Sequence, residues 1–136
     1  MTSAPSPTTA APASDSAAAD KALCEKVGPL VRESLDSGRR FVALGDPGTP
    51  ARDSGIGAYR DHVEGWAQRI QAVIDAQPPP ERYLSRTLQS FVDLNKLYAG
   101  NIRPGPEKPT DAEAWDAGTI ALGGPWETCR ELGVTW

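Results

Sequence analysis

Residues 55–77 read GIGAYRDHVEGWAQRIQAVIDAQ, and this stretch decides the fold. Its large apolar side chains follow one another at alternating steps of three and four residues: Ile56, Tyr59, Val63, Trp66, Ile70 and Val73. This spacing puts them on one face of an α-helix, whereas the opposite face carries charged and amide groups. A helix with one apolar stripe has to bury that stripe against neighbouring helices, so the stretch predicts a helical bundle.

Three other segments show the same helical spacing of apolar residues. Residues 17–44 contain Leu23, Val27, Leu30, Val31 and Leu35, residues 81–99 contain Leu84, Leu88, Phe91, Leu94 and Tyr98, and the chain from residue 110 onward contains Trp115, Thr119, Leu122, Trp126 and Cys129. No segment shows the alternation of a half-buried strand. The sequence therefore predicts an all-α, four-helix bundle-like domain, with Trp66, Trp115 and Trp126 in its core.

Glycine, proline and small polar residues predict where the helices begin, bend and end. Gly28-Pro29 is expected to kink or restart the first helix, because proline cannot donate a backbone hydrogen bond. Ser54 is the predicted N-cap of the second helix, after a loop over residues 45–55. Glu81 is expected to open the third helix. Gly123-Gly124-Pro125 is expected to bend or break the last segment, which would add a short fifth helix.

The first 19 residues differ from the rest of the 136-residue chain. They read MTSAPSPTTAAPASDSAAA, with one charged side chain and, after Met1, no large apolar one. Such a composition cannot bury enough surface to offset the entropy lost when the chain is ordered. Residues 1–19 are therefore predicted to be a disordered tether, and residues 20–136 to form a single helical domain.

Cys24 and Cys129 are the only two cysteines, and they lie near opposite ends of the predicted domain. Each lies on or beside the apolar stripe of its segment, so both sulfur atoms are able to reach one core. Two cysteines cannot complete a structural zinc site by themselves, and no CxxC spacing is present. A disulfide from the first segment to the last is the favoured prediction, and it requires an oxidising compartment. Two separate buried thiols are the alternative.

A tail rich in Ala, Ser, Thr and Pro, followed by one domain with a cysteine near each end, resembles the mature part of small actinobacterial secreted proteins and lipoproteins. In that class a lipid-bearing cysteine lies just upstream of such a tail. The resemblance implies a location outside the cytoplasm, either secreted or anchored at the outer face of the cell membrane, with a lipid anchor upstream of the sequence given. It rests on layout and composition, and it implies no activity.

Composition and charge also narrow the classes of function. The chain carries 18 acidic and 14 basic residues, and its net charge of −4 disfavours nucleic-acid binding. No run approaches the ~18 apolar residues of a transmembrane span. His62 is the only histidine, and no nucleophile–base pair or metal-ligand spacing accompanies it. We therefore expect a monomer that is not an enzyme and that holds no metal or cofactor.

The favoured function is non-catalytic binding of a protein or a cell-envelope component. Candidate partner-binding residues are Tyr98 and Arg103 beside the proline-rich residues 101–109, Trp136 at the chain end, and the basic pair Arg39 and Arg40. Trp136 either folds back on the domain or stays exposed as a contact. An envelope function encoded by a phage or prophage, such as exclusion of a second infection, fits the same features.

Two other classes of function stay open on the sequence. The first is a small-ligand carrier that holds haem or a lipid in a cavity between helices. Tyr59 and His62, three residues apart on one predicted helix, are residue types that ligate haem iron. The second class is an enzyme with an unfamiliar site.

Overall fold

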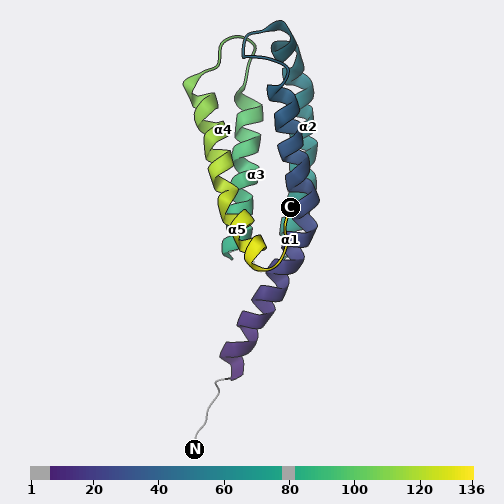
Figure 1. Cartoon of the computed structure of the whole chain (residues 1–136), viewed down its shortest axis with the longest axis vertical. Coiled ribbons are helices and arrows are strands. Elements are labelled where there is room, and N and C mark those ends of the chain that lie inside the picture. The colour runs from purple at the N-terminus through teal and green to yellow at the C-terminus, as the bar shows by residue number, and fades with distance from the viewer. Residues whose placement is uncertain (1–6, 78–81) are drawn as a thin grey trace, which may run out of the picture.

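Five α-helices make up the fold in a computed structural model that describes residues 7–77 and 82–136, with side chains from residue 16 onward. They are α1 (Pro7–Val42), α2 (Pro50–Asp75), α3 (Tyr83–Asn101), α4 (Pro109–Ala121) and α5 (Gly123–Glu131). The described residues contain no strand. The first four helices lie side by side, and the short α5 continues from the end of α4 (Figure 1). The predicted all-α, four-helix bundle with a short fifth helix is confirmed.

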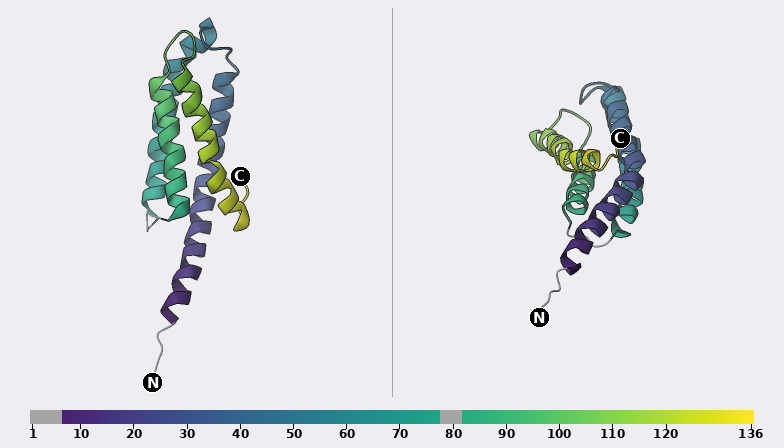
Figure 2. Two further views of the ribbon diagram at one scale, coloured as in Figure 1. Left: turned by 90° about the vertical axis from the view of Figure 1, so that its left-hand side faces the viewer. Right: turned by 60° about the horizontal axis from the view of Figure 1, so that its bottom comes forward.

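The helices pack mainly on their neighbours in the chain. α1 packs on α2, α2 packs on α3, and α3 packs on α4, while α5 contacts α1, α3 and α4. In contrast, α1 and α4 make little direct contact. The bundle therefore has one loosely packed edge, with α1 on one side of it and α4 on the other (Figure 2).

The core consists of the apolar stripes that the sequence predicted. Its buried side chains include Leu23, Val27 and Val31 of α1, Val63, Trp66 and Ile70 of α2, and Leu84, Leu88 and Val92 of α3. Burying one large apolar side chain contributes about 1.5–3 kcal/mol, so these three stripes supply most of the driving force for folding.

Trp126 is an exception, because 43% of its surface is exposed. The buried residues of α4 and α5 form one stripe at helical spacing, which passes through Leu122 without interruption: Asp111, Ala114, Gly118, Leu122, Pro125 and Cys129. Trp126 lies beside this stripe, as does the exposed Thr119. The prediction that Trp126 lies in the core was wrong because it followed the neighbouring line of residues.

Gly28-Pro29 does not restart α1, which is assigned as one helix from Pro7 to Val42. Pro29 is on the exposed side of the helix, as is Glu25. The carbonyl oxygen of Glu25 has no helical hydrogen-bond donor, because Pro29 has no backbone N–H. Water is able to bind that oxygen instead. Gly28 is buried, and a β-carbon there would lie 2.8 Å from Cδ1 of Trp136. The pair makes room for the chain end without ending the helix.

α1 also includes part of the segment predicted to be a tether. The helix begins at Pro7, and the Ala-rich residues 16–19 continue it toward the bundle, as expected from the high helix propensity of alanine. Its first turns extend past the ends of the other helices (Figure 1). Residues 1–6 of the predicted tether lie outside the described residues, and so does the predicted helix start at Glu81.

α2 begins earlier than predicted. Thr49 is its N-cap and Pro50 occupies the first turn, where the fixed φ of proline favours a helix start. Ser54 therefore lies inside the helix, and its hydroxyl donates to the carbonyl oxygen of Pro50 at 2.8 Å. The earlier start also makes Arg52 and Asp53 helical residues, although they were predicted to lie in the preceding loop.

Asp53 ties together the two loops at one end of the bundle. Its carboxylate accepts the backbone N–H of Gly48 at 3.1 Å and that of Gly105 at 3.0 Å. Both glycines have a positive φ, 90° and 106°, which residues with a side chain rarely adopt. The loop between α1 and α2 is thereby held against the loop between α3 and α4.

A disulfide closes the other end of the domain. Cys24 of α1 and Cys129 of α5 are bonded and fully buried, with their Cα atoms 5.5 Å apart. The chain after α5 turns back beside α1 (Figure 2), where Nε1 of Trp136 donates to the carbonyl oxygen of Cys24 at 3.2 Å. The predicted disulfide is confirmed.

Candidate functional site

The five predicted partner-binding residues lie in several different places. Tyr98 is buried and Arg39 is exposed, yet both line one groove between α1, α3 and α4. Arg40 lines a shallow hollow between α1 and α2 instead. Arg103 lies just after α3, and Trp136 lies near the disulfide. The structure thus brings Tyr98 together with Arg39 in this groove, and Tyr98 together with Arg103 in a smaller pocket at the loop end of the bundle.

Arg103 and Trp136 are both held by the domain itself. Nη1 of Arg103 donates to the carbonyl oxygens of Gly100 at 2.8 Å and Ile102 at 2.7 Å, at the end of α3. The Trp136 ring meets Trp126 edge to face with 5.9 Å between ring centroids. Of the two alternatives for Trp136, the fold-back arrangement is the observed one.

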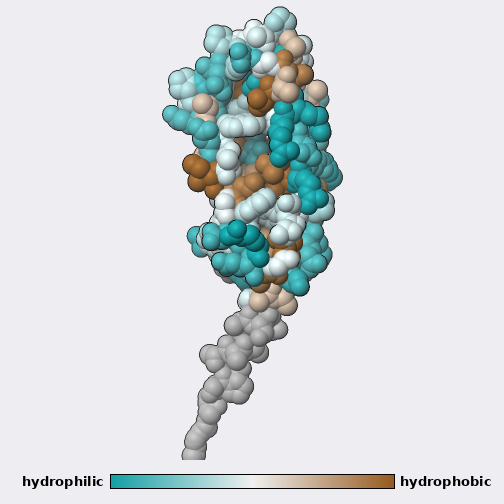
Figure 3. Space-filling model, in the orientation of Figure 1, coloured by the Kyte–Doolittle hydropathy of each residue, from teal (hydrophilic) through white to brown (hydrophobic). Residues whose placement is uncertain are grey.

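The groove between α1 and α4 is the candidate site. It encloses about 150 Å³ and is lined mostly by apolar atoms. In Figure 3 apolar side chains gather at mid-height on this face, from its centre to its left edge, with hydrophilic ones along the right. The lining includes Leu35, Gly38 and Arg39 of α1, Phe91, Leu94, Asn95 and Tyr98 of α3, and Ala114, Trp115, Gly118 and Thr119 of α4.

Small residues keep this groove open. Gly118 and Ala114 of α4 are buried and leave space where larger side chains would fill the hollow. Trp115, also on α4, extends its ring across the groove to α1. A β-carbon at Gly38 of α1 would lie 3.1 Å from Cη2 of that ring. Gly38 and Gly118 were not predicted as site residues. A glycine inside a helical pattern was the signal in the sequence that could have identified them.

Aromatic rings form the wall of the groove and its floor. Tyr98 and Trp115 meet edge to face with 4.9 Å between centroids, and Tyr59 lies 6.2 Å from Tyr98 in a similar geometry. Phe91 is fixed from behind by an edge-to-face contact with Trp66 at 5.7 Å. Because each ring is held by another, the shape of the groove is set before anything binds.

Arg52 supports the floor from the loop end. Its buried guanidinium lies 4.1 Å above the Phe41 ring, and it donates to the carbonyl oxygen of Gly45 at 3.0 Å and to the hydroxyl of Tyr98 at 3.2 Å. Burial raises the pKa of Tyr98, although the neighbouring Arg52 opposes that rise. Tyr98 therefore stays neutral at physiological pH and serves as a wall rather than as an acid or base.

Tyr59 and His62 have different partners. The Tyr59 ring is buried and stacked on Phe41, with 4.3 Å between centroids, and burial raises its pKa well above the usual value. His62 instead places Nε2 3.4 Å from Oε2 of Glu33 on α1. Both side chains line the hollow between α1 and α2, but each is engaged by its own neighbour there.

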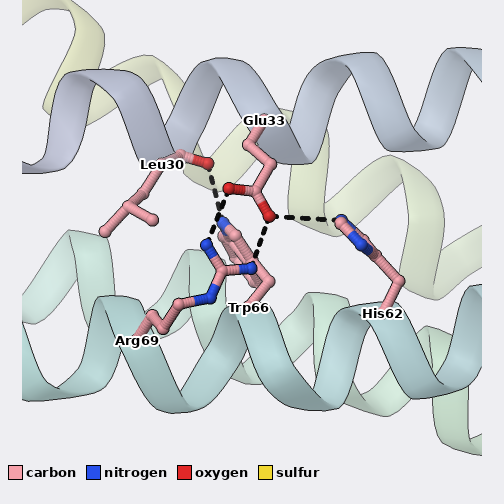
Figure 4. A network of polar contacts seen from close by, with 5 residues as sticks. All are labelled: Leu30, Glu33, His62, Trp66 and Arg69. Carbon is pink, nitrogen blue, oxygen red and sulfur yellow. Dashed lines mark hydrogen bonds and ion pairs between the residues drawn. The ribbon is translucent and has the colours of Figure 1, made fainter.

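Glu33 is the centre of a polar network between α1 and α2 (Figure 4). Arg69 donates to both of its carboxylate oxygens, at 2.8 Å and 2.5 Å, and these bonds hold the pKa of Glu33 below its ordinary value. Beside them, Nε1 of Trp66 donates to the carbonyl oxygen of Leu30 at 2.7 Å. The network links α1 to α2 through one side chain of α1 and three of α2.

The Glu33 network predicts a specific pH dependence of stability. Because the folded state lowers the pKa of Glu33, its carboxylate stabilises the fold above the ordinary glutamate pKa of ~4.3. This contribution is lost as the pH falls through the lowered value. Urea unfolding of wild type and Glu33→Gln should show a stability gap at neutral pH that closes in acid. Glu64→Gln, an exposed change on the same helix pair, should show no such closing gap. A gap for Glu33→Gln that is constant with pH would contradict the prediction.

Other kinds of site were also sought in the part of the chain that the structure describes. There, no three His, Cys, Asp or Glu side chains are grouped so that they could hold a metal ion. None of the described helices combines the length and apolar character needed to cross a membrane. The groove is therefore the feature with the clearest capacity for binding.

Comparison of the chain with protein families, with curated protein sequences and with solved structures finds no match.

Proposed function

We propose that this protein is a non-catalytic binding domain that works outside the cytoplasm, tethered to the cell envelope, and contacts a protein or an envelope component. The observation that carries the proposal is the apolar groove between α1 and α4, an edge that the rest of the bundle leaves loosely packed. Apolar pockets with a few polar groups at the mouth are the usual form of binding sites.

The buried disulfide supports the proposed location. A structural disulfide persists in oxidising compartments and is rare in the cytosol of mesophiles. The Cys24–Cys129 bond joins the first and last helices of the domain, so the fold is most stable in such a compartment. The Ala-rich N-terminal turns of α1 that extend past the bundle are a suitable connection to an anchor.

Binding of a haem is not favoured by the size of the groove. Its volume of about 150 Å³ matches a cavity that holds one benzene molecule, far less than a haem macrocycle occupies. A whole lipid is likewise too large, although the end of one chain would fit. The groove suits one apolar group that belongs to a larger partner.

A site-specific photo-crosslinker tests this proposal. A crosslinking residue at Thr119, on the exposed rim of the groove, should capture an envelope component when the protein is displayed in its native envelope. The matched position is Gly65, which is exposed on α2 and has open space around it. Capture at Thr119 should disappear when Ala114→Leu fills the groove.

Equal capture from Thr119 and Gly65, or capture at Thr119 that survives in folded Ala114→Leu, would contradict the proposal. Circular dichroism establishes that each variant is folded before it is used.

A further inference from the structure

We propose that the groove receives one aromatic side chain from an acidic segment of a protein partner. The inference rests on the proposed binding function and specifies the chemistry of the occupant.

The size of the groove sets the first limit on this occupant. About 150 Å³ is enough for a single six-membered ring and too small for two large side chains. The groove lies at the loosely packed edge of the bundle, so a ring can enter from outside while the segment that carries it stays on the surface. Binding through one deeply inserted aromatic residue is a common arrangement in protein interfaces.

The lining favours an aromatic ring over an aliphatic side chain of similar size. Tyr98, Trp115 and Phe91 line the groove, and Tyr98 and Trp115 already meet edge to face at 4.9 Å. A ring placed among them is able to make further edge-to-face contacts at the same kind of distance.

The positive charge of Arg39 at the groove favours an acidic residue next to the inserted ring. Among the described residues that line the groove, Arg39 alone is charged, and its Nη1 donates to Asp36 at 2.7 Å. A guanidinium has five N–H groups and the side chain is 72% exposed, so further donors are accessible to a ligand. A carboxylate next to the inserted ring would pair with them.

An exposed apolar side chain on the outer face of α4 favours a protein partner over a free small molecule. Ile120 does not line the groove, because it is about 100° around the helix from the groove-lining Thr119, and it is 77% exposed. An isolated ring inside the groove would leave this side chain in water. A polypeptide segment that continues over α4 would cover it, and covering exposed apolar surface is what interfaces do.

Three small probes test the proposal on the purified, disulfide-bonded protein. They are N-acetyl-phenylalanine amide, N-acetyl-leucine amide and N-acetyl-phenylalanine with a free carboxylate. NMR titration should show shifts of the backbone amides of Gly38 and Gly118. The phenylalanine amide should bind about three- to tenfold more tightly than the leucine amide. The free carboxylate should add about two- to fivefold, because Arg39 is exposed and screened.

Matched variants locate the effect. Gly118→Leu should abolish the shifts, because the new side chain fills the groove. Gly65→Leu, at an exposed position of α2, should leave them unchanged. Gly118→Ala, whose β-carbon meets Leu94 at an ordinary 3.7 Å, gives a folded variant with partial loss. Arg39→Gln should remove the preference for the carboxylate, and Arg32→Gln should retain it.

Equal affinity for the phenylalanine and leucine amides would overturn the aromatic assignment. Shifts that persist in Gly118→Leu, or that map away from Gly38 and Gly118, would overturn the location. A carboxylate preference unchanged in Arg39→Gln would overturn the acidic flank. These outcomes are separate from the proposed function: successful crosslinking at Thr119 with equal probe affinities refutes this inference alone. Aromatic-selective probe binding without any capture in the envelope refutes the proposed function, and with it the protein partner.

Discussion

Replacing both cysteines by alanine is expected to lower the free energy of unfolding by about 4–5 kcal/mol. The Cys24–Cys129 bond closes a loop of 105 residues, so removing it restores a large amount of conformational entropy to the unfolded chain. Folding of a domain this small leaves only about 5–15 kcal/mol of net stability. Urea unfolding of wild type and Cys24→Ala/Cys129→Ala at the same pH measures the difference directly.

Reductant provides the control for the disulfide prediction. Wild type that is unfolded, treated with a phosphine reductant and refolded should have the lower free energy of unfolding of the double variant. The same treatment should leave the stability of the double variant unchanged. The native protein should react slowly, because both cysteines are fully buried and Trp136 covers the backbone of Cys24. A loss below ~1 kcal/mol in the double variant would show that the unfolded chain is already compact enough to make the crosslink redundant.

The disulfide also bears on the groove. α1 and α4 make little direct contact, so α1 is joined to the α4–α5 segment mainly at two ends. At one end the Asp53 carboxylate binds both loops, and at the other the disulfide and Trp136 bind α5 and the chain end to α1. The width of the groove is therefore fixed by contacts that lie outside it.

The helices and the disulfide were predictable because they depend on local patterns. A spacing of three and four residues places Leu84 and Leu88 on one helix face whatever the rest of the chain does. Cys24 and Cys129 lie on or beside such stripes, and one core is the only place where two stripes can meet. Apolar spacing over a few helical turns was therefore enough to predict these features.

The groove was not predictable because it depends on residues far apart in the sequence. Gly38 matters only because the Trp115 ring lies against it, and that contact requires the bundle to place α1 and α4 on the two sides of one groove. Arg52 looked like a loop residue, yet the helix start at Pro50 places it against Phe41 and Tyr98. Trp126 followed the apolar spacing, but the buried stripe of α4 and α5 passes beside it through Leu122 and Pro125.

Trp66→Ala is the other substitution with a large expected effect, a loss of about 3–5 kcal/mol in the free energy of unfolding. The indole is 1% exposed, and it meets the edge of Phe91 and donates to the carbonyl oxygen of Leu30. Alanine would leave a cavity between α1, α2 and α3 that the stiff neighbouring helices cannot close. Thermal and urea unfolding followed by circular dichroism measure the loss.

Two variants separate the causes of that loss. Trp66→Phe keeps an aromatic ring but removes the N–H donor and some volume, so a smaller loss of about 1–2 kcal/mol is expected. Trp126→Ala makes the same change at a ring that is 43% exposed and touches Trp136, where about 1 kcal/mol is expected. If Trp126→Ala destabilised the fold as much as Trp66→Ala, the core assignment would be in error.

Because Phe91 lines the groove in front of Trp66, Trp66→Phe should also weaken the binding of the phenylalanine probe, whereas Trp126→Ala should not.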